Sequence, residues 1–157
     1  MSEYTEKDIE LMRIAIEEGR KCVNVETAYN VGAVIATKDK DVLTTGYSRK
    51  YPGNTHAEQC ALMDLEKLKE SPETQKTPLE NLVIYTTMEP CSTRLSGNWP
   101  CYKRILESKI DTVFIGVMEP PVFGNFTSVE ELINNGIKVI HMKELEKECK
   151  DLSSHLF

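Results

Sequence analysis

The order of strand-like and helix-like segments restricts the fold of this chain more than any other feature of its sequence. After a first helical segment, two apolar runs typical of strands flank the polar turn TKDKD, and further apolar runs then alternate with helical patterns. A helix between two neighbouring strands returns the chain to the same end of the sheet, so the later strands should be parallel. With the antiparallel hairpin, this order predicts a mixed sheet covered by helices.

The predicted strands are short and mostly apolar. The hairpin should pair Val31–Ala36 with Val42–Tyr47, and the remaining strands are expected at Asn81–Thr87, Asp111–Val117 and residues 137–141. We therefore expect an α/β fold, a three-layer α/β/α sandwich around a mixed five-stranded sheet. The 157 residues contain no internal repeat and no linker-like segment, so we expect one domain over residues 1–157.

Periodicity and end signals predict the helices. Thr5 and Asp8 have the spacing of a capping box, and their helix should run to about Cys22 with one apolar face, formed by Ile9, Met12 and Ile16. A second helix should open at Thr55 and stop before Ser71, with an apolar face formed by Ala61, Leu65 and Leu68. Later helices are expected from Pro100, over residues 127–136 and from Lys143.

Composition argues against two classes of partner. The net charge is −6, whereas binding to nucleic acid depends on Lys and Arg side chains that neutralise phosphates. No apolar run approaches the roughly 20 residues that span a bilayer. The first twenty residues are acidic and amphipathic, unlike a signal peptide. We therefore expect a cytoplasmic protein with no nucleic-acid partner and no membrane partner.

Two of the five cysteines follow prolines and flank a polar loop. Cys91 and Cys101 are ten positions apart in PCSTRLSGNWPC, and Cys91 comes just after a predicted strand. Structural zinc sites usually pair cysteines two to four residues apart, so this spacing by itself leaves a metal site, a disulfide and coincidence open. An odd number of cysteines in a cytoplasmic chain favours metal or catalytic use of some of them.

His56 completes a candidate Zn²⁺ site with Cys91 and Cys101. His56 is expected in the first turn of the second helix and Cys101 in the first turn of the third, and helix amino termini favour thiolate over thiol. Three protein ligands leave the fourth tetrahedral position open, which is typical of catalytic zinc. Glu58, two residues after the histidine, would not ligate the metal, and its carboxylate would instead move protons.

Zinc deaminases share the signature H-x-E followed by P-C-x-x-C. His56 and Glu58 match its first half and Cys91 opens its second half, but Arg94 stands where the next cysteine is expected. Simpler interpretations also stay open. Thr55 and Glu58 have the spacing of a capping box, which would use the carboxylate for the backbone. Cys60 is one helical turn from His56, although a buried thiol is the commoner fate of such a residue.

Further segments extend the match well beyond the candidate ligands. TAYNVGAVIA, TGYSRKYPGNTHAEQCAL and FIGVMEPPVFGNFTS, together with PCSTRLSGNWPC, extend from Thr27 to Ser128. In these segments the chain resembles the fungal deaminases of riboflavin biosynthesis, which have the cytidine deaminase-like fold and in which a loop displaces the second cysteine. Bacterial members carry Asn-Pro where this chain has Ala28-Tyr29, so the pyrimidine contacts of that asparagine are not carried over.

The resemblance implies a small-molecule substrate, 2,5-diamino-6-ribitylamino-4(3H)-pyrimidinone 5′-phosphate. Deamination at ring carbon 2 would give 5-amino-6-ribitylamino-2,4(1H,3H)-pyrimidinedione 5′-phosphate and ammonia. Zinc would lower the pKa of its bound water, and Glu58 would pass the water proton to a ring nitrogen and help protonate the departing amine. Relatives of this fold often associate, so a homodimer is also an expectation.

Polar side chains on and beside the loop are candidates for substrate binding. Lys103 is expected in the first turn of a helix, where a positive charge opposes the helix dipole unless an anion docks there. Arg94, Ser96 and Asn98 add donors on the loop itself. Asn54, just before the second helix, is a candidate by position.

Two other functions stay open at this point. One is a deaminase of a free base or nucleoside, such as cytosine or cytidine, and the lengthened loop with its basic flank counts against it. The other is a non-catalytic zinc-binding protein of the same fold. The presence of Glu58 and an open coordination position argue against that alternative.

Overall fold

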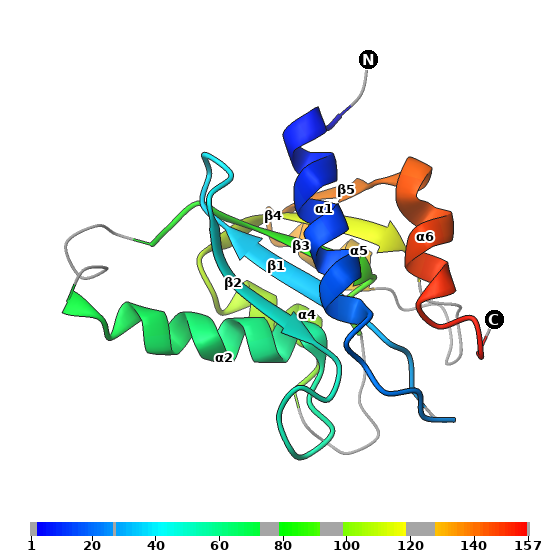
Figure 1. The fold of residues 1–157 in the computed structure, drawn as a ribbon. Helices are drawn as coiled ribbons and strands as arrows, with labels where there is room; N and C mark the ends of the chain where they lie inside the picture. Colours follow the sequence, from blue (N-terminus) through cyan, green and yellow to red (C-terminus); the bar gives the residue numbers. More distant parts are fainter. Residues whose placement is uncertain (1–2, 27, 73–78, 92–98, 119–127, 157) are drawn as a thin grey trace.

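A five-stranded sheet forms the centre of the computed structural model, which describes residues 3–26, 28–72, 79–91, 99–118 and 128–156 (Figure 1). The strand order is β2-β1-β3-β4-β5, with β1 at Gly32–Ala36, β2 at Val42–Tyr47, β3 at Leu82–Met88, β4 at Ile110–Val117 and β5 at Lys138–His141. β1 is antiparallel to both β2 and β3, whereas β3, β4 and β5 are parallel. The predicted mixed sheet is confirmed.

Helices cover both faces of this sheet (Figure 1). One face carries α1 (Glu6–Gly19), the 3₁₀ turn η1 (Lys143–Leu145) and α6 (Glu146–Asp151). The other face carries α2 (Ala57–Lys69), α4 (Cys101–Leu106) and α5 (Ser128–Asn134). A separate apolar cluster lies under each layer, so the three-layer sandwich is confirmed. Among the described residues, no helix is both long enough and apolar enough to cross a bilayer.

Helix α1 begins as predicted but ends earlier. The Asp8 backbone N–H donates to Oγ1 of Thr5 over 3.3 Å, and the Thr5 backbone N–H donates to Oδ2 of Asp8 over 2.9 Å. The helix ends at Gly19 rather than near Cys22. The reason is that the N–H groups of Lys21 and Cys22 bond to carbonyls three residues back and tighten the chain into turns.

Helix α2 lies directly on β2 because Gly46 has no side chain. A Cβ atom at this position would stand 2.3 Å from the carbonyl oxygen of Ala57 and 2.8 Å from the backbone nitrogen of Ala61. The neighbouring Thr44 hydroxyl donates to the Ala61 carbonyl over 2.9 Å. These contacts set the position of the first turns of α2 relative to the sheet.

An extra methyl group in a well-packed region usually costs about 1–3 kcal/mol. We expect Gly46→Ala to lower the free energy of unfolding by an amount near the upper end of this range, because the new methyl group meets backbone rather than a flexible side chain. Thr45→Ala, on the same strand, is the control. Side chains alternate along a strand, so residue 45 faces away from α2 and its truncation should cost less than about 1 kcal/mol. Urea denaturation of both variants measures the difference, and equal small losses would contradict the close packing.

Candidate metal centre

Three side chains that are far apart in the sequence meet beside the carboxyl end of β3, the central strand of the sheet. His56 is the N-cap of α2, Cys91 follows β3, and Cys101 is the first residue of α4. Nδ1 of His56 lies 3.5 Å from Sγ of Cys91 and 3.4 Å from Sγ of Cys101. The three ligating atoms all lie within 4.8 Å of one another. The structure thus brings the predicted ligands together, although His56 precedes the first turn of its helix instead of lying in it.

The distances between these atoms suit a tetrahedral zinc site. With Zn–S bonds of about 2.3 Å and Zn–N bonds of about 2.0 Å, a sulfur and a nitrogen ligand of one tetrahedron stand about 3.5 Å apart. Both sulfur–nitrogen distances in the cluster agree with this value. Thiolate and imidazole are ligand types that zinc prefers, and three of them leave one position for water or substrate. The donor set therefore fits a catalytic Zn²⁺ ion.

The start of α4 holds the two sulfurs within 4.8 Å of each other. The Cys101 backbone N–H donates to Sγ of Cys91 over 3.1 Å, and the Tyr102 N–H donates to the Cys91 carbonyl over 3.4 Å. A hydrogen bond from the Cys101 thiol lowers the pKa of Cys91 to about 4, against the effect of burial and with the help of His56. The pKa of Cys101 is raised, because its thiol donates that hydrogen bond to Cys91 and is buried. A cation between the sulfurs would favour loss of this remaining proton.

Glu58 lies beside the ligands and is only 4% exposed. Its Oε1 is 2.7 Å from the hydroxyl oxygen of Thr86. Burial raises the pKa of Glu58, and the negative charge on Cys91 raises it further. A buried carboxyl beside the ligands is in a position to take up and release a proton, as general acid–base catalysis requires.

The alternative in which Glu58 caps α2 is wrong. The His56 backbone N–H donates to Oε1 of Gln59 over 3.2 Å, so Gln59 supplies this cap. The Thr55 side chain instead accepts from the N–H of Tyr51 over 3.1 Å and donates to the Tyr51 carbonyl over 2.7 Å. Because Thr55 closes the preceding loop in this way, the cap of α2 is His56 rather than Thr55 and the helix begins one residue later than predicted, so the carboxyl of Glu58 stays available to the metal centre.

The alternative in which Cys60 chelates a metal with His56 has no support. Cys60 is fully buried, and its Cβ lies against Gly46 on β2. Within the described part of the chain, the cluster of possible metal ligands consists of His56, Cys91 and Cys101.

Arg49 fastens the loop that leads to His56, and sequence reasoning did not single it out. Its guanidinium donates to the carbonyls of Val23 and Tyr29 over 3.0 and 3.2 Å, and to Oδ1 of Asn30 over 2.5 Å. Its backbone, in the left-handed region with φ of 64°, donates from N–H to the Thr55 carbonyl over 2.6 Å. The loop before α2 is thereby tied to the segment before β1.

The predicted substrate-binding residues fall into two groups. Asn54 and Lys103 are described: Asn54 has a left-handed backbone with φ of 56° two positions before His56, and Lys103 is exposed on α4. The loop residues Arg94, Ser96 and Asn98 lie outside the described residues, as does the segment 119–126 after β4. Beside Lys103, Nε of Arg104 donates to the Trp99 carbonyl over 3.3 Å and so secures the residue before the Pro100 turn.

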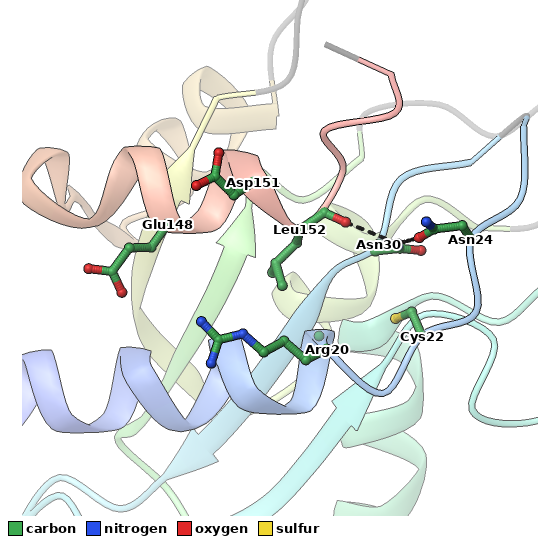
Figure 2. A pocket seen from close by; sticks show the side chains of 8 residues that line it. Arg20, Cys22, Asn24, Asn30, Glu148, Asp151 and Leu152 are labelled. Carbon is green, nitrogen blue, oxygen red and sulfur yellow. Dashed lines mark hydrogen bonds between the residues drawn. The ribbon is translucent and has the colours of Figure 1, made fainter.

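A separate pocket of about 290 Å³ lies beside the ends of α1 and α6 (Figure 2). Residues of α1, α6 and the segment before β1 line it. Nδ2 of Asn30 donates to Oδ1 of Asn24 over 2.6 Å and to the Leu152 carbonyl over 3.0 Å at its edge (Figure 2). Because α1 and α6 pack on the opposite face from α2, this pocket takes no part in the metal centre.

Known proteins share both the sequence pattern and the fold. Residues 5–117 match the family model for the cytidine and deoxycytidylate deaminase zinc-binding region. The diaminohydroxyphosphoribosylamino-pyrimidine deaminase of Schizosaccharomyces pombe is 41% identical over 140 residues, which are 89% of this chain and 33% of that protein. The chain spans about a third of the length of curated relatives such as these.

Solved structures agree with this relationship. The Rib2 deaminase of Aspergillus oryzae, crystallised in complex with DARIPP, is 30% identical with a TM-score of 0.80, and the match covers 94% of this chain and 90% of that chain. A deaminase/reductase from Thermotoga maritima is 34% identical with a TM-score of 0.77, over 94% of this chain and 39% of that chain. The chain therefore belongs to the cytidine and deoxycytidylate deaminase zinc-binding family and, within it, to the deaminases of the riboflavin-biosynthesis type.

Proposed function

We propose that this protein catalyses the zinc-dependent hydrolytic deamination of 2,5-diamino-6-ribitylamino-4(3H)-pyrimidinone 5′-phosphate. The products are 5-amino-6-ribitylamino-2,4(1H,3H)-pyrimidinedione 5′-phosphate and ammonia. The observation that carries this proposal is the buried carboxyl of Glu58 beside a His-Cys-Cys cluster that fits zinc. The relationship to a deaminase that binds DARIPP supports this substrate class.

The reacting carbon bears an amine within a delocalised guanidine-like unit, so neutral water attacks it slowly. Bound zinc supplies a stronger nucleophile by lowering the pKa of water toward neutrality. The two cysteine thiolates offset much of the positive charge of the metal, which makes a neighbouring base necessary. Glu58 would take one proton from water and deliver it to a ring nitrogen. It would then take the proton of the hydroxyl group added to the ring carbon and deliver it to the departing amine, so that a carbonyl forms, ammonia leaves and Glu58 ends the cycle as a carboxylate.

Variants of Glu58 and Cys101 separate catalysis from metal binding. Glu58→Gln is expected to retain zinc and to lose turnover by about 10²- to 10⁴-fold, because the amide cannot carry the proton. Cys101→Ser should lose both zinc and turnover, because a thiolate ligand is removed. Metal analysis and ammonia release on the same samples measure the two effects. Near-normal turnover of Glu58→Gln would overturn the assignment of Glu58.

The substrate phosphate is proposed to bind near the start of α4, where Lys103 is exposed. Lys103→Ala should raise KM for the phosphorylated substrate about tenfold, with a much smaller effect on the dephosphorylated compound, because a charge-assisted hydrogen bond is lost. Arg94→Ala on the loop should behave in the same way, and Ser96, Asn98 and Asn54 are proposed to add polar contacts. Lys109→Ala, an exposed lysine beyond the other end of α4, is the matched control. Equal effects on both compounds would refute the phosphate contact.

A substrate panel tests the reaction itself. Ammonia release should be fastest with the phosphorylated riboflavin precursor and at least about 100-fold slower with cytosine, cytidine and guanine, because a site built for one set of polar groups rejects ligands that lack them. Comparable rates with cytosine or cytidine would favour a free-base or nucleoside deaminase. No release from any of these compounds would favour a non-catalytic zinc-binding protein.

A further inference from the structure

Thr86 interrupts an apolar row on β3 at the point where this row reaches the metal centre. Leu82 and Ile84 belong to the apolar cluster under α2 and α4, and side chains two residues apart lie on the same face of a strand. Thr86 is therefore the next side chain on the face that carries α2, and it is fully buried. A buried hydroxyl costs free energy unless it has hydrogen-bond partners, so its contacts explain why it is there.

Two oxygens lie within hydrogen-bond distance of the Thr86 hydroxyl. Oε1 of Glu58 is 2.7 Å away, and the carbonyl oxygen of Met88 is 2.8 Å away. A hydroxyl has one proton to donate and two lone pairs to accept with, whereas the carbonyl only accepts. The Thr86 hydroxyl can therefore donate to the carboxylate, or accept from the carboxylic acid while donating to Met88. In both arrangements its contact with Glu58 persists.

We propose that Thr86 is the positioning residue for Glu58, holding one carboxyl oxygen so that the group stays directed at the metal centre while it passes a proton. This inference rests on the proposed function, in which Glu58 is the proton carrier. Glu58 reaches the site from the first turn of α2 through a flexible side chain, and the hydrogen bond with Thr86 restricts that flexibility. Loss of the Thr86 contact should impair the chemical step more than substrate binding.

Thr87 provides a matched control from the adjacent position. It is also a buried threonine of β3, 1% exposed, and its hydroxyl oxygen accepts a hydrogen bond from the Gly32 N–H over 3.1 Å. Side chains alternate along a strand, so Thr87 faces the α1 layer and has no contact with Glu58. Replacing Thr87 with valine removes a comparable buried hydrogen bond without touching the site.

The test compares Thr86→Val, which keeps the shape but not the hydroxyl, with Thr86→Ser, which keeps the hydroxyl. Thr86→Val is expected to retain zinc and to lower kcat per bound zinc about 10- to 100-fold, with KM changed less than about threefold. Thr86→Ser and Thr87→Val should keep kcat within about threefold of the parent protein. In a Glu58→Gln background, Thr86→Val should add little further loss, because the residue it positions no longer carries a proton.

Each result supports or overturns the assignment. Unchanged kcat in Thr86→Val, or an equal loss in Thr86→Ser or Thr87→Val, would overturn it. Loss of zinc or folding in both Thr86→Val and Thr86→Ala would show a structural role and would overturn it as well. If the parent protein releases no ammonia from the phosphorylated pyrimidine, the proposed function itself fails. If Glu58→Gln keeps parental turnover, Glu58 does not carry the proton and the positioning role of Thr86 falls with it. If Glu58→Gln loses turnover while Thr86→Val keeps it, only the positioning role is rejected.

Discussion

The close approach of α2 to the sheet at Gly46 is the constraint on which the metal centre depends. His56 and Glu58 belong to the cap and first turn of this helix, so both move with its amino end. The sulfur ligands come from different elements, one after β3 and one at the start of α4. An extra methyl group at Gly46 would push His56 and Glu58 away from the two sulfurs, which do not belong to this helix. The geometry of the metal centre thus depends on this backbone contact as well as on the ligating side chains.

Much of this arrangement follows from local sequence signals, and the rest depends on contacts between distant residues. The strands and the capping box of α1 were predictable because periodicity and capping act over a few positions. The spacing of Thr55 and Glu58 suggested a cap, but Gln59 supplies it, since Thr55 is already engaged by Tyr51. The predicted end of α1 lay too far along the chain, because a helical sequence pattern does not reveal where the backbone tightens into turns.

Two important side chains could not be assigned from the sequence because their partners are remote. Thr86 meets a carboxyl 28 positions away, and the guanidinium of Arg49 meets Asn30 19 positions away. The only local signal for a role of Thr86 was its hydroxyl group in an otherwise apolar strand, and Thr87 gives the same signal. The two threonines serve opposite layers: one contacts the metal centre, and the other holds the start of β1 beside β3. Alternation along a strand separates these roles without any change of residue type.

The sequence separation of the ligands has a mechanical consequence. A metal ion shared by residues 56, 91 and 101 closes one loop across 35 positions and another across ten, as a disulfide would. Loop-closure entropy grows only logarithmically, so the longer loop costs about 1 kcal/mol more to close than the shorter one. A bound ion would thereby link the start of α2, the end of β3 and the start of α4, which are otherwise held together by packing and hydrogen bonds. A bound ion would therefore also stabilise the fold at this end of the sheet, because metal binding adds its free energy to that of folding.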